Sequence, residues 1–105
     1  NLAGWRRERM SALPSEDFFS QPPDWICEVL SPSTELTDRS EKLDIYAEHG
    51  VSHAWLVHPL QRSLEIYRLD PSRRYVRLLA VHGDLVVRPE PFDAVPLDLT
   101  SIWPA

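Results

Sequence analysis

Two short apolar segments stand out in the pattern of hydrophobic and polar positions. Residues 25–30 (Trp-Ile-Cys-Glu-Val-Leu) are apolar at five of six positions and lie between a Pro-Pro-Asp run and a Ser-Pro-Ser run. Residues 53–58 (His-Ala-Trp-Leu-Val-His) are mostly apolar and precede Pro59. Short apolar runs bounded by turn residues are typical of buried strands. We therefore expect two buried strands here.

The stretch between these strands has helical periodicity. Leu36, Leu43, Tyr46 and Ala47 form one apolar stripe, and Gly50 follows at a position that often ends a helix. This pattern predicts a helix from about residue 35 to residue 49. A strand, a helix and a strand with short connections form a parallel pair through a right-handed crossover.

The rest of the chain predicts mainly antiparallel structure. An antiparallel meander is expected over residues 63–69, 74–81 and 84–88, with a half-exposed first strand and with its arginine side chains in water. Residues 98–103 suit a short closing turn of helix, and residues 1–23 are expected to be an irregular loop or linker. The predicted fold class is therefore α+β: a mixed β-sheet with a crossover helix, followed by an antiparallel meander.

Composition places these elements in one small domain spanning residues 1–105. The single cysteine, Cys27, has no partner for a disulfide or a zinc site, which favours a reducing, cytoplasmic setting. No apolar run approaches the roughly 20 residues of a membrane helix, so no membrane partner is expected. Because the chain begins with Asn1 rather than Met, we expect it to be part of a longer chain.

The formal net charge is −5, and it is unevenly distributed. Residues 24–48 carry seven acidic and two basic residues, which argues against a phosphate-binding surface there. Residues 62–77 instead contain five arginines, which form either a solvated face or a nucleic-acid contact: Arg62, Arg68, Arg73, Arg74 and Arg77.

Glu28 is the one charged residue inside the first apolar strand. A buried carboxylate costs several kcal/mol unless it is paired, hydrogen-bonded or bound to a metal. Asp24 is too distant to share a metal with it, because four residues of strand span about 13 Å. Lys42, the only lysine, lies at the border of the apolar helix stripe and can face Glu28. The two groups form either a plain buried ion pair or half of a metal-dependent hydrolytic site.

Several residues together resemble a known family. The residues are Pro23-Asp-Trp-Ile-Cys-Glu-Val-Leu-Ser-Pro-Ser-Thr34, then Asp38, Lys42, Tyr46, Gly50-Val51 and Trp55-Leu-Val-His-Pro59. This pattern resembles the Uma-type endonucleases of bacteria, in the restriction-endonuclease-like PD-(D/E)xK nuclease superfamily. The resemblance spans nearly the whole chain, including residues 3–10 and the C-terminal tail.

The resemblance implies a restriction-endonuclease-like core that lacks the N-terminal part of the full family domain. It implies that Glu28, the backbone carbonyl of Val29 and the residue at position 1 bind Mg²⁺ or Mn²⁺. It also implies that Lys42 takes the role of the motif lysine, since Leu30 occupies the usual lysine position. The expected activity is hydrolysis of phosphodiester bonds in DNA by a metal-dependent endonuclease with Glu28 and Lys42 as catalytic residues.

Two departures from the family pattern leave a second hypothesis open. Asn1 stands where the first metal-binding acid is expected, and His58 stands where the family commonly has Asp. Asparagine is a poorer ligand than a carboxylate for Mg²⁺, and histidine does not favour that ion. The alternative is a catalytically degenerate nuclease-fold domain that acts as an interaction or dimerisation module. Exposed apolar residues on a shortened core would favour a homodimer.

Other candidate side chains have simpler explanations. The histidines lack regular metal-ligand spacing: His49, His53, His58 and His82. Cys27 alternates with Trp25 on the apolar face and is expected to be a core residue rather than a nucleophile. Ser31 and Ser33 are expected to cap the helix. Trp5 is expected in the core, with stacking on a nucleobase as the alternative.

Overall fold

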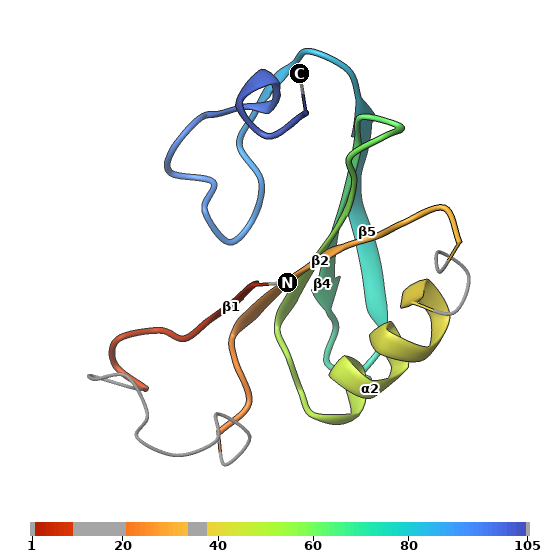
Figure 1. The fold of residues 1–105 in the computed structure, drawn as a ribbon. Coiled ribbons are helices and arrows are strands. Elements are labelled where there is room, and N and C mark those ends of the chain that lie inside the picture. The colour runs from red at the N-terminus through yellow and green to blue at the C-terminus, as the bar shows by residue number, and fades with distance from the viewer. Residues whose placement is uncertain (1, 10–20, 34–37, 105) are drawn as a thin grey trace.

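The fold is a mixed five-stranded sheet with strand order β1-β2-β3-β4-β5 (Figure 1). The structure is a computed structural model that describes residues 2–9, 21–33 and 38–104. The pair β2/β3 is parallel, and the other neighbouring pairs are antiparallel. The strands are β1 (Leu2–Gly4), β2 (Trp25–Val29), β3 (His53–His58), β4 (Ser63–Leu69) and β5 (Tyr75–His82).

The parallel pair needs a crossover, and a short helical segment supplies it. This segment consists of a π-helical turn, η2 (Asp38–Lys42), and an α-helix, α2 (Leu43–Glu48). The helix expected from residue 35 to residue 49 is thus confirmed from residue 38 on, while residues 34–37 lie outside the described ranges. Gly50 follows with φ +73°, a left-handed conformation that glycine adopts without a steric penalty, so the helix ends where the sequence predicts.

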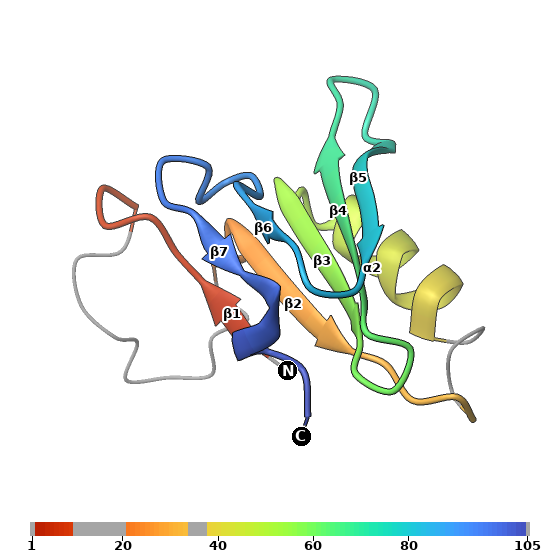
Figure 2. The same cartoon turned by 90° about the horizontal axis from the view of Figure 1, so that it is seen from above.

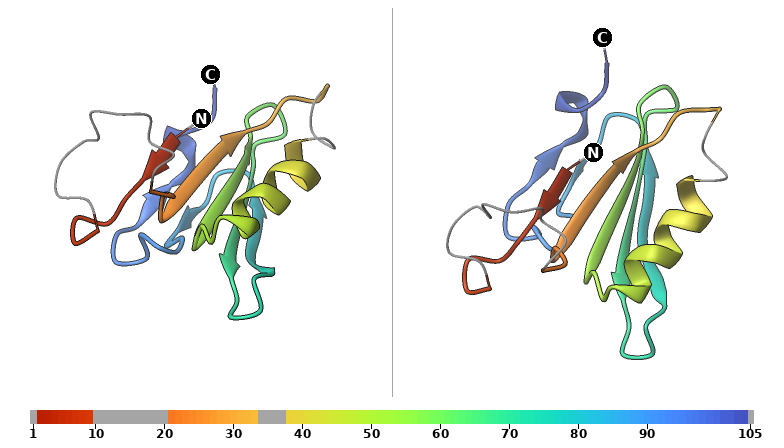
Figure 3. Two further views of the ribbon diagram at one scale, coloured as in Figure 1. Left: turned by 90° about the horizontal axis from the view of Figure 1, so that it is seen from below. Right: turned by 60° about the horizontal axis from the view of Figure 1, so that its bottom comes forward.

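The two faces of the sheet have different covers (Figure 2; Figure 3). The helical segment lies over one face, and the C-terminal part of the chain lies over the other. Strand alternation places Cys27, Trp55 and Ile66 on the second face, in a core cluster that Leu99 and Trp103 complete. A 3₁₀-helix, η3 (Leu99–Ser101), carries Leu99, as the expected closing turn requires.

Part of the predicted meander is wrong. β5 pairs with β4, as expected, but β6 (Val86–Val87) leaves that sheet and pairs with β7 (Leu97–Asp98). The three consecutive apolar residues 85–87 suit either partner, so the pattern could not decide between them. Val87 and Leu97 both pack against the core cluster, and burial of this apolar surface favours the second arrangement.

The N-terminal region is also more regular than expected. Leu2–Gly4 forms a strand in the sheet, where a loop was expected. Three residues are too few to show a period-2 pattern. Gly4 suits this position because an added Cβ would lie 3.1 Å from the ring of Trp25, so a larger residue would push β1 away from β2.

The half-exposed strand expected over 63–69 is more buried than predicted. Leu64 and Ile66 are buried in the core cluster, and Glu65 on the opposite face is buried as well, because the helical segment covers the polar face of β4 as well as the face of β2. Among the described helices, none has the length and apolar character that would let it cross a membrane.

Candidate functional site

Glu28 is buried on the face of the sheet that the helical segment covers, with 3% of its surface exposed. The hydroxyl of Tyr46 donates a hydrogen bond to Oε1 of Glu28. The ammonium group of Lys42 lies 3.2 Å from Oε2. The predicted convergence of Glu28 and Lys42 is therefore confirmed, and these contacts offset the cost of removing the carboxylate from water. The Lys42 side chain is 36% exposed, so solvent reaches this ion pair from its side.

A second buried carboxylate lies in the same row across the sheet. Glu28 is paired in register with Leu56, and Leu56 is paired with Glu65 on β4. Side chains opposite one another in register point to the same face. Glu28 and Glu65 therefore flank Leu56 beneath the helical segment.

Glu65 is surrounded by hydrogen-bond donors. Both terminal nitrogens of Arg39 donate to its carboxylate, at 2.5 and 2.6 Å, and the hydroxyl of Tyr67 donates at 2.7 Å. His58 lies 3.3 Å away and Arg77 lies 3.6 Å away. Burial alone would raise the pKa of Glu65, but the hydrogen bonds from Arg39 and Tyr67 prevail and lower it from 4.5 to about 2. Glu65 therefore stays ionised at neutral pH.

The two carboxylates hold one helical segment at two points. Arg39 and Lys42 are three residues apart in η2, and each makes an ion pair with a different strand. The sequence analysis did not identify Arg39 or Glu65 as functional residues. Glu65 occupies a polar position in an alternating strand, a pattern that ordinarily indicates exposure to water. The one sequence feature that could have pointed to Glu65 was the place of its strand beside the expected parallel pair.

The other residues singled out from the sequence are Val29, Asn1 and His58. Val29 follows Glu28 in β2, with a side chain that is 50% exposed. Asn1, the predicted third ligand, lies outside the described residues. His58 is buried beside Arg39 and Glu65. No group of three or more His, Cys, Asp or Glu side chains suited to a metal ion occurs in the described ranges.

These donors determine which metal could fit. Glu28 offers carboxylate oxygens, whereas Lys42 and Tyr46 donate hydrogen bonds and are not ligands for Mg²⁺. Mg²⁺ is commonly held by one or two carboxylates, with water and substrate phosphates filling the other positions. The described residues fit that mode of binding through Glu28, but they do not form a cage made only of protein atoms.

The five arginines of residues 62–77 contact different parts of the chain. Arg62 donates to the carbonyl of Pro104, and Arg73 donates to the carbonyl of Glu48. Arg68 pairs with Glu90. Arg77 alone of the five contacts Glu65 beneath the helical segment. Four of the five arginines thus contact other parts of the protein, while Arg74 is exposed.

Cys27 lies in the core cluster, as expected, and His53 is buried in polar contacts. Burial raises the pKa of the Cys27 thiol to about 11, which leaves little thiolate for nucleophilic attack. His53 lies 3.0 Å from Glu90, which also pairs with Arg68. These contacts lie at the start of β3, away from Glu28.

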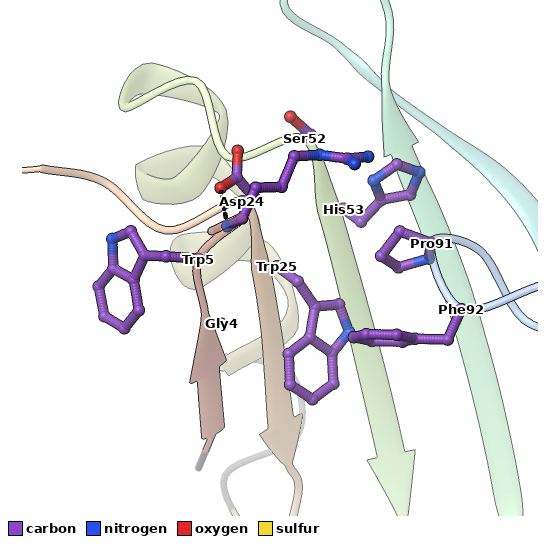
Figure 4. A pocket seen from close by; sticks show the side chains of 9 residues that line it. Gly4, Trp5, Asp24, Trp25, Ser52, His53, Pro91 and Phe92 are labelled. Carbon is purple, nitrogen blue, oxygen red and sulfur yellow. Dashed lines mark hydrogen bonds between the residues drawn. The ribbon is translucent and has the colours of Figure 1, made fainter. Parts of the chain in front are cut away.

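A cavity of about 250 Å³ opens near the first residues of β2 and β3 (Figure 4). Trp25 and Phe92 form its aromatic wall, with ring centroids 5.1 Å apart and planes at 87°. The indole nitrogen of Trp25 is buried without a hydrogen-bonding N or O atom, and in Figure 4 it lies beside the Phe92 ring. Such an edge-to-face pair gives the N–H a weak π acceptor. Asp24 at the cavity already accepts from the backbone N–H of Arg6 and from Arg9.

Comparison with known proteins decides the family. The Uma2 family model, described as "Putative restriction endonuclease", matches residues 3–100. The chain belongs to the Uma2 family. A solved structure, described as "a putative nuclease belonging to DUF820" from Anabaena variabilis, is 24% identical with a TM-score of 0.57. The match covers 79% of this chain and 45% of that chain, so this Uma2 chain spans less than half of the length of its structural relative.

The structural match confirms the predicted fold class. The mixed sheet with its short crossover helix shares the fold of the structure described as a putative nuclease. No match was found among curated proteins. The family and the fold class of this Uma2 chain are thus shown.

Proposed function

We propose that this chain is the core of a metal-dependent endonuclease that hydrolyses phosphodiester bonds in DNA, with Glu28 and Lys42 as its catalytic residues. One observation carries the proposal: the Glu28 carboxylate, buried in an apolar strand, faces the only lysine of the chain, which lies on the crossover helical segment. Membership of a restriction-endonuclease family supports the reaction type.

Each residue has a distinct proposed role. Glu28 and the backbone carbonyl of Val29 would hold Mg²⁺ or Mn²⁺, with Asn1 as the predicted further ligand. A bound divalent ion supplies positive charge beside the phosphoryl oxygens and lowers the pKa of coordinated water. Lys42 positions the attacking water and stabilises negative charge on the phosphate. Tyr46 orients the Glu28 carboxylate through its hydrogen bond.

The proposal is tested by cleavage of plasmid and single-stranded DNA in Mn²⁺. Glu28→Gln should weaken the site for the divalent ion, and Lys42→Ala should remove positive charge beside the phosphate. Each should lower the cleavage rate by about 100-fold or more, the usual effect of losing one group that stabilises transition-state charge. Glu41→Gln is the matched control, because Glu41 is an exposed carboxylate on the same turn as Lys42. Full activity in Glu28→Gln would overturn the proposal.

A second candidate function rests on the contacts of Glu28 itself. Both of its oxygens already accept hydrogen bonds, from Tyr46 and Lys42, which is also what a purely structural ion pair requires. The domain would then be a catalytically degenerate interaction or dimerisation module. A folded protein that binds no Mn²⁺ at millimolar concentration and cleaves no DNA would favour this alternative.

A further inference from the structure

A polar hollow of about 410 Å³ lies over β4 and β5, on the face of the sheet that the helical segment covers. Its floor includes small and polar side chains from two paired strands, and two guanidinium groups line it. The residues that matter here are Arg39, Gln61, Ser63, Arg77, Ala80 and His82.

The hollow carries local positive charge in an acidic chain. Arg39 and Arg77 together carry two positive charges, and Glu65 between them carries one negative charge. The Glu65 carboxylate is paired with Arg39 at short distance, so its charge is largely offset and the positive charge of Arg77 stays in excess. The chain as a whole has a formal charge of −5, which makes this positive balance a local feature.

Arg77 is free to turn toward a ligand. Its side chain is 57% exposed, and its 3.6 Å separation from Glu65 is longer than a strong charge-assisted hydrogen bond. Because Arg39 and Tyr67 make the short contacts with Glu65, that carboxylate keeps these partners if Arg77 moves. Gln61, Ser63 and His82 add side chains that can donate hydrogen bonds to phosphate oxygens.

The hollow continues the row that contains Glu28. Register runs from Glu28 through Leu56 and Glu65 to Ala80 on the floor of the hollow. Neighbouring strands are about 4.8 Å apart, so Glu28 and Glu65 lie about 10 Å apart along this row. One DNA strand carries a phosphate about every 3.4 Å of helix axis, so a chain of a few nucleotides covers this distance.

The geometry points to this hollow as a binding site for a backbone phosphate of the DNA strand that is cleaved at Glu28 and Lys42. The inference rests on the proposed function and deepens it: Arg77 and Arg39 position the strand, while the chemistry takes place two strands away. Phosphate contacts of this kind fix the register of the nucleic acid without reading its sequence.

The test measures DNA binding in the Glu28→Gln background, where cleavage is suppressed. A short fluorescein-labelled oligonucleotide, as single strand and as duplex, is titrated by anisotropy over a range of NaCl concentrations. Arg77→Ala should weaken binding about threefold to tenfold and reduce the slope of log K against log salt by about one, as expected for one lost phosphate contact. Arg77→Lys, which keeps the charge, should retain most of the slope.

The matched control is Arg74→Ala, an exposed arginine on the turn between β4 and β5 that lies outside the hollow. Equal affinities and slopes for Arg77→Ala and Arg74→Ala would overturn the inference, as would the absence of DNA binding by the parent protein. The two proposals fail separately. If the wild type cleaves DNA and Arg77→Ala has no effect on binding, only the proposed phosphate site is overturned. If Arg77→Ala weakens DNA binding but the wild type does not cleave DNA, only the proposed nuclease activity is overturned.

Discussion

At the scale of single residues, the decisive group is the Glu28 carboxylate. It lies in an apolar strand, and its oxygens accept hydrogen bonds from two residues of the crossover helix. Sequence alone could predict this pairing because a charge in an apolar run needs a partner and the chain has one lysine. It could not predict Tyr46 as the second partner, because a tyrosine on a helix stripe is ordinarily a packing residue.

The Tyr46 hydroxyl and Glu28 should be energetically coupled. Tyr46→Phe leaves one buried carboxylate oxygen with one donor fewer, and we expect it to cost about 1 to 3 kcal/mol in the free energy of unfolding. The double variant Glu28→Gln with Tyr46→Phe should lose less than the sum of the single losses, by about 0.5 kcal/mol or more. Urea unfolding of the four proteins measures this coupling. Strict additivity would show that the contact does not bear on stability.

Lys42 should oppose metal binding while it supports cleavage. Its ammonium group occupies one oxygen of Glu28, so Lys42→Ala exposes that oxygen to a cation. We expect Mn²⁺ affinity, measured by calorimetry, to be equal or higher in Lys42→Ala and to fall in Glu28→Gln. DNA cleavage should be lost in both variants. A large loss of Mn²⁺ affinity in Lys42→Ala would contradict the assigned roles.

At the scale of elements, two ion pairs hold the helical segment on the sheet. η2 and α2 are short, and α2 has no fully buried residue, so little apolar burial fixes them on the sheet. Two ion pairs fix the segment on the sheet instead, one between Arg39 and Glu65 and one between Lys42 and Glu28. The order of strand, helix and strand followed from periodicity. The second ion pair did not, because it joins residues 26 positions apart in the chain.

Glu65 should make the free energy of unfolding depend on pH in the acidic range. Its pKa is lowered from 4.5 to about 2 in the folded protein, so the stabilisation is present above pH 4.5 and is lost as pH falls from about 4.5 toward 2. Side-chain carboxyl NMR should show a Glu65 midpoint well below 4.5, and urea unfolding should weaken over that pH range. Tyr67→Phe should raise the midpoint because it removes one donor. A midpoint at or above 4.5 would refute the assigned contacts.

At the scale of the whole molecule, the sheet is closed on one face by the helical segment and on the other by the C-terminal part. The mixed topology and the parallel pair were predictable, because turn residues and periodicity mark β2, β3, β4 and β5. The departure of β6 from the sheet was not predictable, since its short apolar run suits two partners equally. The homodimer expected from exposed apolar residues, such as Leu60 at 77% exposure, stays a prediction.

Trp103 should be essential for closing the second face. It is 8% exposed, packs in the core cluster and donates from its indole nitrogen to the carbonyl of Gly83 at 2.9 Å. Trp103→Ala should lower the free energy of unfolding by about 3 to 5 kcal/mol. Val95→Ala, at a side chain that is 64% exposed, should change it by about 0.5 kcal/mol or less. Thermal and urea unfolding compare the two, and similar losses would argue against a core role for the tail.

The spacing of Arg39 and Lys42 also limits how this protein can change in length during evolution. One residue inserted or deleted between them would rotate the second side chain by roughly a quarter of a turn around the helix axis, since a turn of such a helix holds about four residues. Such a change would separate one cation from its strand even if every amino-acid type were kept. Functional relatives should therefore tolerate substitutions within this turn far more readily than any change in its number of residues.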